Sequence, residues 1–184
     1  KADGWYYKGF IYNAISKRNE LKALCGNCKM EAFEAFKKYQ ELDKKNILMA
    51  LEQNVSLFDL YNGLFDQGAA AYNDKNYKAA FENFRDALLV EDYVRGKGFD
   101  YQGYKYPALD TQLVLNTALA ARFDKNDEAA ITYYNILSAA NIGGPEYLEM
   151  YQFLAIHYKD KKDATNFSAA LAQGRKLYPE DPFW

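Results

Sequence analysis

Residues 68–88 carry the feature that most restricts the fold, an amphipathic helical stretch followed by a polar turn and a second amphipathic stretch. Gly68 and Ala71 place small residues on one helical face, and the segment 73–76 (NDKN) interrupts the periodicity. Apolar residues then resume at helical spacing, at Tyr77, Ala80, Phe84, Ala87 and Leu88. Two such helices joined by a short turn form a helical hairpin, in which neither helix can bury its apolar stripe alone. The hairpin therefore needs neighbours of the same kind.

The same pattern recurs along the chain and supplies those neighbours. Downstream, small and apolar residues at helical spacing flank two further polar turns, 123–127 (FDKND) and 159–163 (KDKKD). An upstream copy begins close to the first residue. We therefore predict an all-α fold of about four hairpins in a single domain spanning residues 1–184. The predicted units are about 2–60, 61–110, 111–147 and 148–184.

The spacing and chemistry of these units resemble the tetratricopeptide repeat (TPR) family, whose hairpins of roughly 34 residues stack in series. The matching residues are Trp5, Gly9, Tyr12, Ala32 and Phe36; Leu64, Gly68, Ala71, Tyr77, Ala80, Phe84 and Ala87; Val114, Ala118, Ala121, Ala130 and Tyr134; and Tyr151, Ala155, Tyr158, Phe167, Leu171 and Pro179. The resemblance covers nearly the whole chain. It implies a right-handed α-α superhelix, that is, a TPR-like solenoid.

The units are longer than the family repeat, so the chain carries insertions. Residues 46–60 keep an apolar stripe and are expected to extend the following helix at its N-terminal end. Residues 93–107 (YVRGKGFDYQGYKYP) contain three Gly and one Pro without periodicity, so we expect a loop there. The segment 143–145 (GGP) predicts a helix stop followed by Pro in the first turn of the next helix.

The resemblance also implies a binding surface, because the first helices of TPR hairpins line a concave groove that holds a peptide. The corresponding residues are Asp3, Tyr6, Phe10, Asn13, Asn62, Phe65, Ala69, Tyr72, Gln112, Leu115, Leu119, Arg122, Glu149, Gln152, Ile156 and Lys159. Those we take as candidate binding residues are Tyr6, Asn13, Asn62, Phe65, Tyr72, Gln112, Arg122, Gln152 and Lys159. Chaperone-binding members place Lys and Asn where this chain has Tyr6 and Phe10, so a chaperone cofactor is disfavoured. The implied function is a non-enzymatic scaffold for a protein or peptide partner.

The aromatic loop 93–107 suggests an alternative ligand. It gathers the aromatic residues Tyr93, Phe99, Tyr101, Tyr104 and Tyr106 with Arg95, Lys97 and Lys105. Tyrosines on such a loop can stack on sugar rings or grip a peptide, and Tyr101 and Tyr104 are the candidates. They can equally fold back over an apolar flank. TPR-like scaffolds with aromatic loops also occur among glycan-binding surface lipoproteins, so a glycan-binding scaffold is the main alternative.

Cys25 and Cys28 form a Cys-x-x-Cys pair and are the only cysteines. One reading is a redox-active dithiol, because Cys28 would lie near a helix N-terminus that lowers thiol pKa. The others are a small disulfide or two reduced thiols closing an inserted loop. Redox motifs of this spacing belong to a βαβ context, which the helical pattern does not provide. Structural zinc needs about four ligands, and the one histidine, His157, is distant and more typical of packing, so no metal is expected.

The bulk composition excludes several classes of function. The 184 residues carry a net charge of only −2, which does not fit a phosphate-backbone binder, so nucleic acid is not an expected partner. No apolar run is long enough to span a membrane. No catalytic triad order, HExxH motif or phosphate-binding glycine loop occurs, so we expect neither enzymatic activity nor a cofactor.

The location and the oligomeric state are less constrained. The chain begins at Lys1 without Met and is read as a mature or excised segment. The paired cysteines and the Tyr-, Asn- and Lys-rich helices resemble secreted or periplasmic TPR proteins of bacteria, with a cytoplasmic location as the alternative. Terminal aromatic residues such as Trp5 and Trp184 could dock on a neighbouring molecule, so the oligomeric state stays open.

Overall fold

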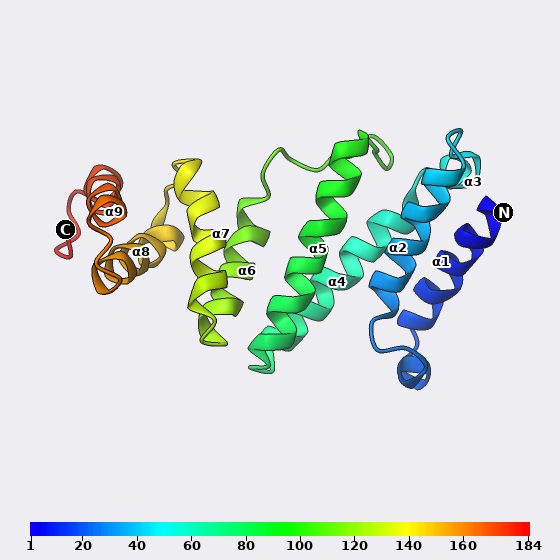
Figure 1. Cartoon of the computed structure of the whole chain (residues 1–184), viewed down its shortest axis with the longest axis horizontal. Helices are drawn as coiled ribbons and strands as arrows, with labels where there is room; N and C mark the ends of the chain where they lie inside the picture. Colours follow the sequence, from blue (N-terminus) through cyan, green and yellow to red (C-terminus); the bar gives the residue numbers. More distant parts are fainter. The chain divides into compact units, whose positions relative to one another are not determined.

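A computed structural model describes the backbone of residues 1–184 and the side chains at every position except 19 and 22. Within the described chain, 74% of residues are helical and no strand forms. The helices are α1 (Ala2–Ser16), α2 (Cys28–Leu42), α3 (Ile47–Leu51), α4 (Val55–Asn73), α5 (Tyr77–Lys97), α6 (Thr111–Phe123), α7 (Asp127–Ala139), α8 (Leu148–Asp160) and α9 (Ala164–Leu177), with 3₁₀ helices η1 (Asn19–Leu24) and η2 (Pro145–Tyr147) (Figure 1). The all-α prediction is confirmed.

The long helices pack in neighbouring pairs, α1 with α2, α4 with α5, α6 with α7 and α8 with α9. Three of these pairs fall within single predicted repeat units, whereas α4 begins at Val55, before the predicted boundary at residue 61. The chain divides into two compact units, Lys1–Asp110 with α1 to α5 and Thr111–Trp184 with α6 to α9. The amphipathic pattern requires that neighbouring helices pack in pairs, as they do here. A continuous superhelix through both units remains a prediction.

In the first unit, both hairpins close on a glycine that faces an aromatic ring. A Cβ added at Gly9 would lie 2.6 Å from Cε1 of Phe36, and one added at Gly68 would lie 2.6 Å from Cδ1 of Phe84. Both rings are buried, and the rest of the core is built from large aliphatic and aromatic side chains, chiefly Phe33, Tyr39, Met49, Leu57, Leu60, Leu64, Val90 and Val94. The absence of a side chain on each glycine lets the helices of its hairpin approach closely.

Three hairpin turns share one local structure. The side chains of Asn76, Asn126 and Asp163 each accept a hydrogen bond from the backbone N–H three residues later, at 3.3, 3.2 and 3.0 Å respectively. These bonds cap the second helix of each pair by satisfying an N–H that has no partner within the helix. Lysines occupy the left-handed turn position in all three, namely Lys75, Lys125 and Lys162. The predicted polar turns therefore lie where the sequence pattern places them.

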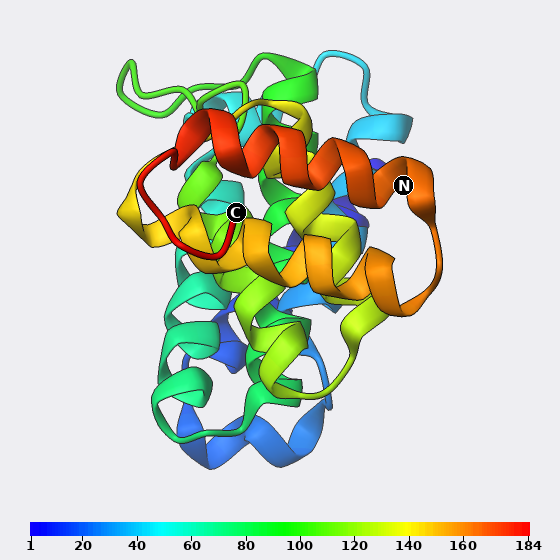
Figure 2. The ribbon, with the colours of Figure 1, turned by 90° about the vertical axis from the view of Figure 1, so that its left-hand side faces the viewer.

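In the second unit, α6 to α9 pack around fully buried Tyr134, Leu137 and Tyr151. Pro145 opens η2 at its first position, directly before α8, as the GGP segment predicts. Figure 2 shows α8 and α9 running side by side with the C-terminal segment folded back beside them. That segment is fixed by Arg175, whose Nε donates to the carbonyl of Trp184 at 2.8 Å.

Two sequence predictions about the insertions need correction. Residues 46–60 do not form one helical extension, because Gln53 and Asn54 adopt left-handed φ angles of 54° and 57° and separate α3 from α4. Only the part from Val55 onward belongs to α4. The expected loop 93–107 begins later than predicted, because α5 continues to Lys97 and ends at Gly98, where φ is 68°. Among the described residues, no helix combines the length and apolar character needed to cross a bilayer.

Candidate functional site

One concave surface of the first unit is a cavity of about 330 Å³ formed by α4 and the loop that follows α5. We call it the tyrosine pocket, and its lining residues are Val55, Phe58, Asp59, Tyr61, Asn62, Tyr101, Tyr104 and Tyr106. The α4 residues share one side of the helix because they recur at spacings of three and four residues. The loop contributes the other wall. Aromatic walls with a few polar groups are typical of ligand sites.

The aromatic rings of the tyrosine pocket pack around Tyr106, and their solvent exposure increases from Tyr106 to Tyr104 at the rim of the pocket. Tyr106 is 8% exposed and stacks on Phe58, with ring centroids 5.1 Å apart. Tyr61 lies 4.7 Å from Tyr106, and Tyr104 meets it edge-on at 5.5 Å. Tyr104 itself is 55% exposed. The buried rings therefore hold the rim ring in place while its other surface faces water.

The loop that carries the tyrosines is tied to the helices at its C-terminal end. Nη1 of Arg95 donates to the carbonyl of Pro107 at 3.2 Å and to Glu91 Oε1 at 3.1 Å. The hydroxyl of Tyr61 donates to Asp110 Oδ2 at 3.2 Å. These bonds fix the C-terminal end of the loop to α5 and α4.

The tip of the same loop is a tight turn. Tyr101 and Tyr104 exchange backbone hydrogen bonds of 3.1 and 3.0 Å, and the two residues between them both have positive φ. The second of these is Gly103, at φ 82°, where a glycine is favoured. The turn places both tyrosines over the same pocket.

A buried carboxylate, Glu91, acts electrostatically on Tyr61 and Tyr106 of the tyrosine pocket. Glu91 is 1% exposed, and burial together with the nearby Asp110 raises its pKa to about 7, although Arg95 acts in the opposite direction. Burial also raises the pKa of the Tyr61 and Tyr106 phenols, with Asp110 adding to the effect at Tyr61. The phenols therefore stay neutral donors at physiological pH.

Three of the sequence candidates line the tyrosine pocket, a fourth adjoins it, and the rest lie elsewhere. Asn62, Tyr101 and Tyr104 all line the tyrosine pocket, and Phe65 continues its wall by stacking on Tyr61 at 6.4 Å. Tyr72 lies farther along α4 against Tyr77, with ring centroids 5.4 Å apart.

The two candidates on α1 serve packing between helices. Asn13 is buried, and its Nδ2 donates to Asp59 Oδ2 at 2.6 Å. Tyr6 is half-buried and donates to Glu52 Oε2 at 3.3 Å; burial, with a further effect of Glu52, raises the Tyr6 pKa to about 12. Asn13 does not lie on an open surface, because it is buried against Asp59 of α4. The family spacing that selected Asn13 as a groove residue gives no information about this contact.

In the second unit, the candidates are dispersed over its surface. Gln112 donates to Asn116 at 3.0 Å, and Gln152 donates to Asp181 at 3.2 Å. Arg122 lies over the Phe153 ring, with its guanidinium carbon 4.7 Å from the ring centroid. Lys159 borders a shallow hollow of about 170 Å³ beside Tyr158 and Phe167. His157 packs between aromatic neighbours, 5.6 Å from the ring of Tyr158.

Cys25 and Cys28 form a disulfide, so of the three interpretations of this pair the structure has the bonded one. Cys28 is the first residue of α2, and Asn27 caps that helix through a hydrogen bond to its side chain from Met30 N. The disulfide borders a second, polar cavity of about 490 Å³. Among the described residues, no cluster of His, Cys, Asp and Glu could hold a metal ion.

Sequence reasoning missed the α4 side of the tyrosine pocket. Phe58, Asp59 and Tyr61 lie within one helical turn of Asn62, which was predicted, so helical periodicity alone could have added them. Of the polar cavity, only Cys25 and Cys28 were singled out from the sequence, and not as part of a cavity, because its lining comes from four separate segments. Comparison of the chain with protein-family models, with curated proteins and with solved structures gives no match.

Proposed function

We propose that this protein is a non-enzymatic TPR-like binding scaffold that holds a peptide segment of a partner protein in the tyrosine pocket and along the adjoining face of α4. One observation carries the proposal: Asn62, singled out as a groove residue, and Tyr101 and Tyr104, singled out as loop residues, line the same cavity. A groove helix and an inserted loop thus converge on one surface.

The chemistry of the pocket suits a peptide side chain with an adjoining backbone. Tyr104 offers a ring that is more than half exposed, and rings of this kind make large contacts at low entropic cost. Asn62 is exposed on the pocket rim, and its amide can both donate to and accept from a peptide group. Phe65 and Ala69 extend the half-buried apolar face by about two helical turns, or roughly 10 Å. An elongated ligand would cover this length.

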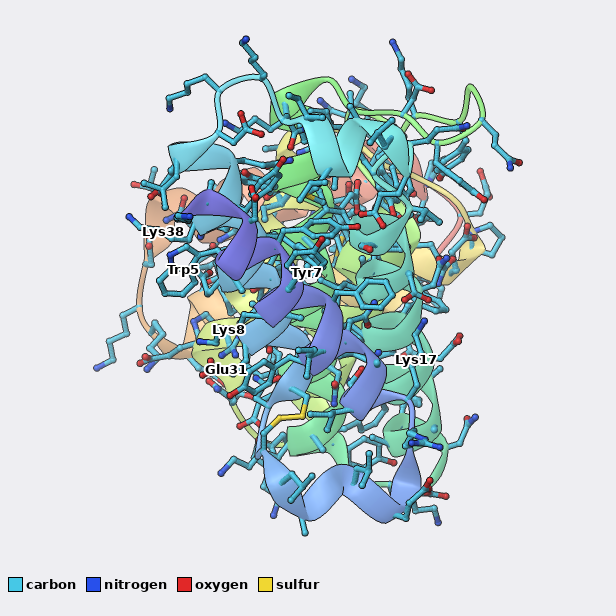
Figure 3. All side chains as sticks on the ribbon, turned by 90° about the vertical axis from the view of Figure 1, so that its right-hand side faces the viewer. Trp5, Tyr7, Lys8, Lys17, Glu31 and Lys38 are labelled. Carbon is cyan, nitrogen blue, oxygen red and sulfur yellow. A yellow bond between two sulfur atoms is a disulfide. The ribbon has the colours of Figure 1, made fainter. Side chains whose placement is uncertain are left out.

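A peptide-display screen against the purified protein tests the proposal. Selected peptides should bind in a saturable manner, and Tyr104→Ala and Asn62→Ala should each weaken binding by about tenfold or more. Tyr7→Ala is the matched control, because Tyr7 lies on α1 (Figure 3) and is 57% exposed, almost the same as Tyr104. Equal losses in all three variants, or peptides insensitive to every one of them, would contradict the proposal.

A glycan ligand is the second candidate, favoured by the polar groups beside the rings. Sugars stack on an aromatic face while their hydroxyls bond to amides and carboxylates, and the tyrosine pocket has both Asn62 and Asp59. A glycan array distinguishes the two ligands: binding lost in Tyr101→Ala and Tyr104→Ala favours the glycan, and an array without signal removes it.

The disulfide supports an oxidising compartment, such as the periplasm or the extracellular space, as the proposed location.

A further inference from the structure

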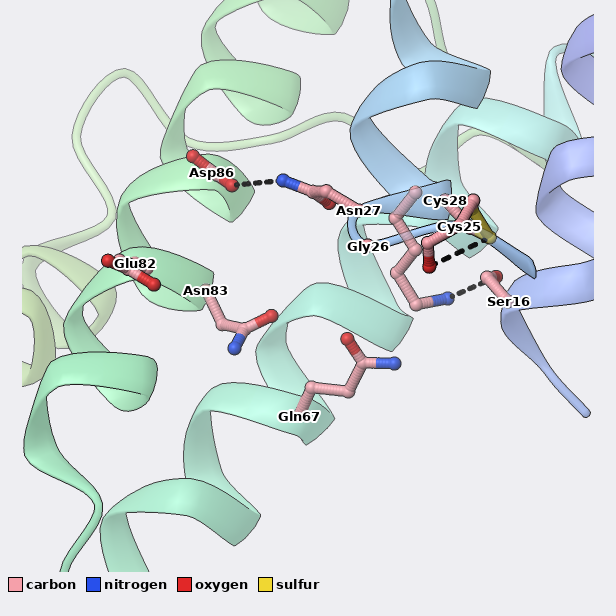
Figure 4. A pocket seen from close by; sticks show the side chains of 10 residues that line it. Ser16, Cys25, Gly26, Asn27, Cys28, Gln67, Glu82, Asn83 and Asp86 are labelled. Atoms are coloured by element: carbon pink, nitrogen blue, oxygen red, sulfur yellow. Dashed lines mark hydrogen bonds between the residues drawn. A yellow bond between two sulfur atoms is a disulfide. The ribbon is translucent and has the colours of Figure 1, made fainter. Parts of the chain in front are cut away.

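The polar cavity of the first unit has the features of a second, independent binding site (Figure 4). Its lining comes from the end of α1, the 25–28 loop with the start of α2, the middle of α4 and the first half of α5: Ser16, Cys25, Gly26, Asn27, Cys28, Lys29, Gln67, Glu82, Asn83 and Asp86. The volume of about 490 Å³ falls within the range of small-molecule sites, roughly 300–1,000 Å³. In contrast to the tyrosine pocket, no aromatic ring lines it.

Lys29 is the unusual residue of this cavity. Its side chain is 5% exposed, and its ammonium donates a hydrogen bond to Ser16 Oγ at 3.1 Å. The ion pairs among the described side chains do not include it, and Asp59 and Asp66 act on it only from a longer distance. Asp59 is itself engaged by Lys17 at 2.6 Å.

A buried ammonium that has only a neutral partner is unfavourable. Burial accordingly lowers the pKa of Lys29, and the distant carboxylates restore it only in part. An anionic group placed in the cavity beside Lys29 would complete its coordination.

The opposite side of the cavity carries the opposite charge. Figure 4 shows Glu82 on the far side from Ser16, the hydrogen-bond partner of Lys29, with Gln67 and Asn83 between them. The Glu82 carboxylate is exposed, whereas the neighbouring Asp86 is already held by Arg85 at 2.8 Å. The lining therefore holds the Lys29 ammonium and two carboxylates, of which Asp86 is already paired with Arg85.

Two amide side chains occupy the space between these charges. Asn83 Nδ2 donates to the carbonyl of Ala79 at 2.8 Å, which leaves its Oδ1 facing the cavity as an acceptor. Gln67 supplies a second amide that can both donate and accept. Side-chain amides of this kind complement the N–H and C=O of a peptide bond.

We propose that the polar cavity binds a short peptide with free termini, of about dipeptide size. Its carboxylate pairs with Lys29, its peptide group bonds to Gln67 and Asn83, and its ammonium group pairs with Glu82. This site does not depend on the function proposed for the tyrosine pocket, because the two cavities share no lining residue.

Calorimetry with alanyl-alanine as the probe tests the site on the intact chain. Free dipeptide should bind with one-to-one stoichiometry. The N-acetylated and C-amidated forms, each lacking one charge, should bind at least about tenfold more weakly. No detectable binding of the free dipeptide at about 10 mM, or equal binding of the blocked forms, overturns the proposal.

Variants locate the binding. Lys29→Met and Glu82→Gln should each reduce affinity by about tenfold or more, whereas Lys44→Met, at an exposed lysine of the same unit, should not. Because Lys29→Met changes a buried site, Gln67→Ala serves as a second variant, and circular dichroism checks that each one is folded. Binding that survives in folded Glu82→Gln and Gln67→Ala would place the dipeptide elsewhere. Loss caused only by Tyr104→Ala would instead assign it to the tyrosine pocket.

Discussion

Gly68 and Phe84 pack so closely that a methyl group on the glycine would overlap the ring, with 2.6 Å between the added Cβ and Cδ1 of Phe84. Gly9 and Phe36 repeat this relationship in the preceding hairpin. The repetition indicates that the two hairpins of the first unit are built to one design.

Replacing Gly68 with alanine should destabilise the first unit. Alanine favours the helix by about 1 kcal/mol over glycine, but overpacking against a buried ring costs roughly 1–3 kcal/mol, so the net change is a loss. Gly4→Ala is the control, because nothing lies within 4 Å of the added Cβ and only the favourable effect remains. Urea unfolding should show the two variants shifted in opposite directions; equal shifts would contradict the packing account.

The buried carboxylate of Glu91 should make stability depend on pH. Its pKa of about 7 in the folded protein is above the ordinary value of 4.5, so between these pH values the unfolded chain has lost a proton that the folded chain retains. The free energy of unfolding should therefore decrease as the pH rises through this window and level off above pH 7.

Glu91→Gln should remove this dependence. The variant should gain stability relative to the natural chain as the pH rises, by at most about 3 kcal/mol, since one pKa unit corresponds to about 1.4 kcal/mol. Denaturant titrations between pH 5 and 8 measure the difference, with Glu20→Gln, at an exposed glutamate, as the control. A difference that does not change with pH would show that Glu91 is not the titrating group.

The disulfide between Cys25 and Cys28 should contribute modestly to stability. It closes a short loop, with a sequence separation of 3, so the chain-entropy contribution is only about 2 kcal/mol. Thermal melts with and without dithiothreitol should differ accordingly, and the Cys25→Ser/Cys28→Ser variant should not respond to the reductant. Two free thiols in the unreduced, denatured protein would refute the pairing.

Each helix-capping side chain should stabilise its own hairpin. Asn76→Ala removes the acceptor for Ala79 N and should cost about 1 kcal/mol, and Asn126→Ala should do the same for the cap on Ala129 N. Hydrogen exchange should locate the first loss in α5 and the second in α7. Asn76→Asp keeps the acceptor and should lose little, so an aspartate variant as unstable as the alanine variant would contradict the capping role.

The helix pairs could be predicted because the chemistry that specifies them is local. Small residues, aromatics and polar turns recur within the hairpins, so the helix pairs were predicted without knowledge of their neighbours, although α4 begins at Val55 and not near residue 61. The end of α5 was misplaced because Gly96 and Gly98 suggested a loop. Val90 and Val94, one turn apart and both buried, continue the apolar face and were the signal that the helix persists.

The candidate sites were predictable only in part, because a cavity depends on contacts between distant segments. Asn62, Tyr101 and Tyr104 were found through family spacing and loop composition. Nothing near Lys29 in the sequence reveals that its ammonium reaches Ser16 on another helix. The burial of Asn13 likewise follows from Asp59, which is 46 residues away along the chain.

The anchoring of the aromatic loop bears on how fast and how firmly it can capture a ligand. Arg95 donates a hydrogen bond to the carbonyl of Pro107, and Tyr61 donates one to Asp110. The C-terminal part of the loop is therefore already immobilised before anything binds. Little conformational freedom is left to be lost on association. Ligands should therefore meet a rigid receptor, and removing the Arg95 side chain should slow their capture although Arg95 does not line the tyrosine pocket.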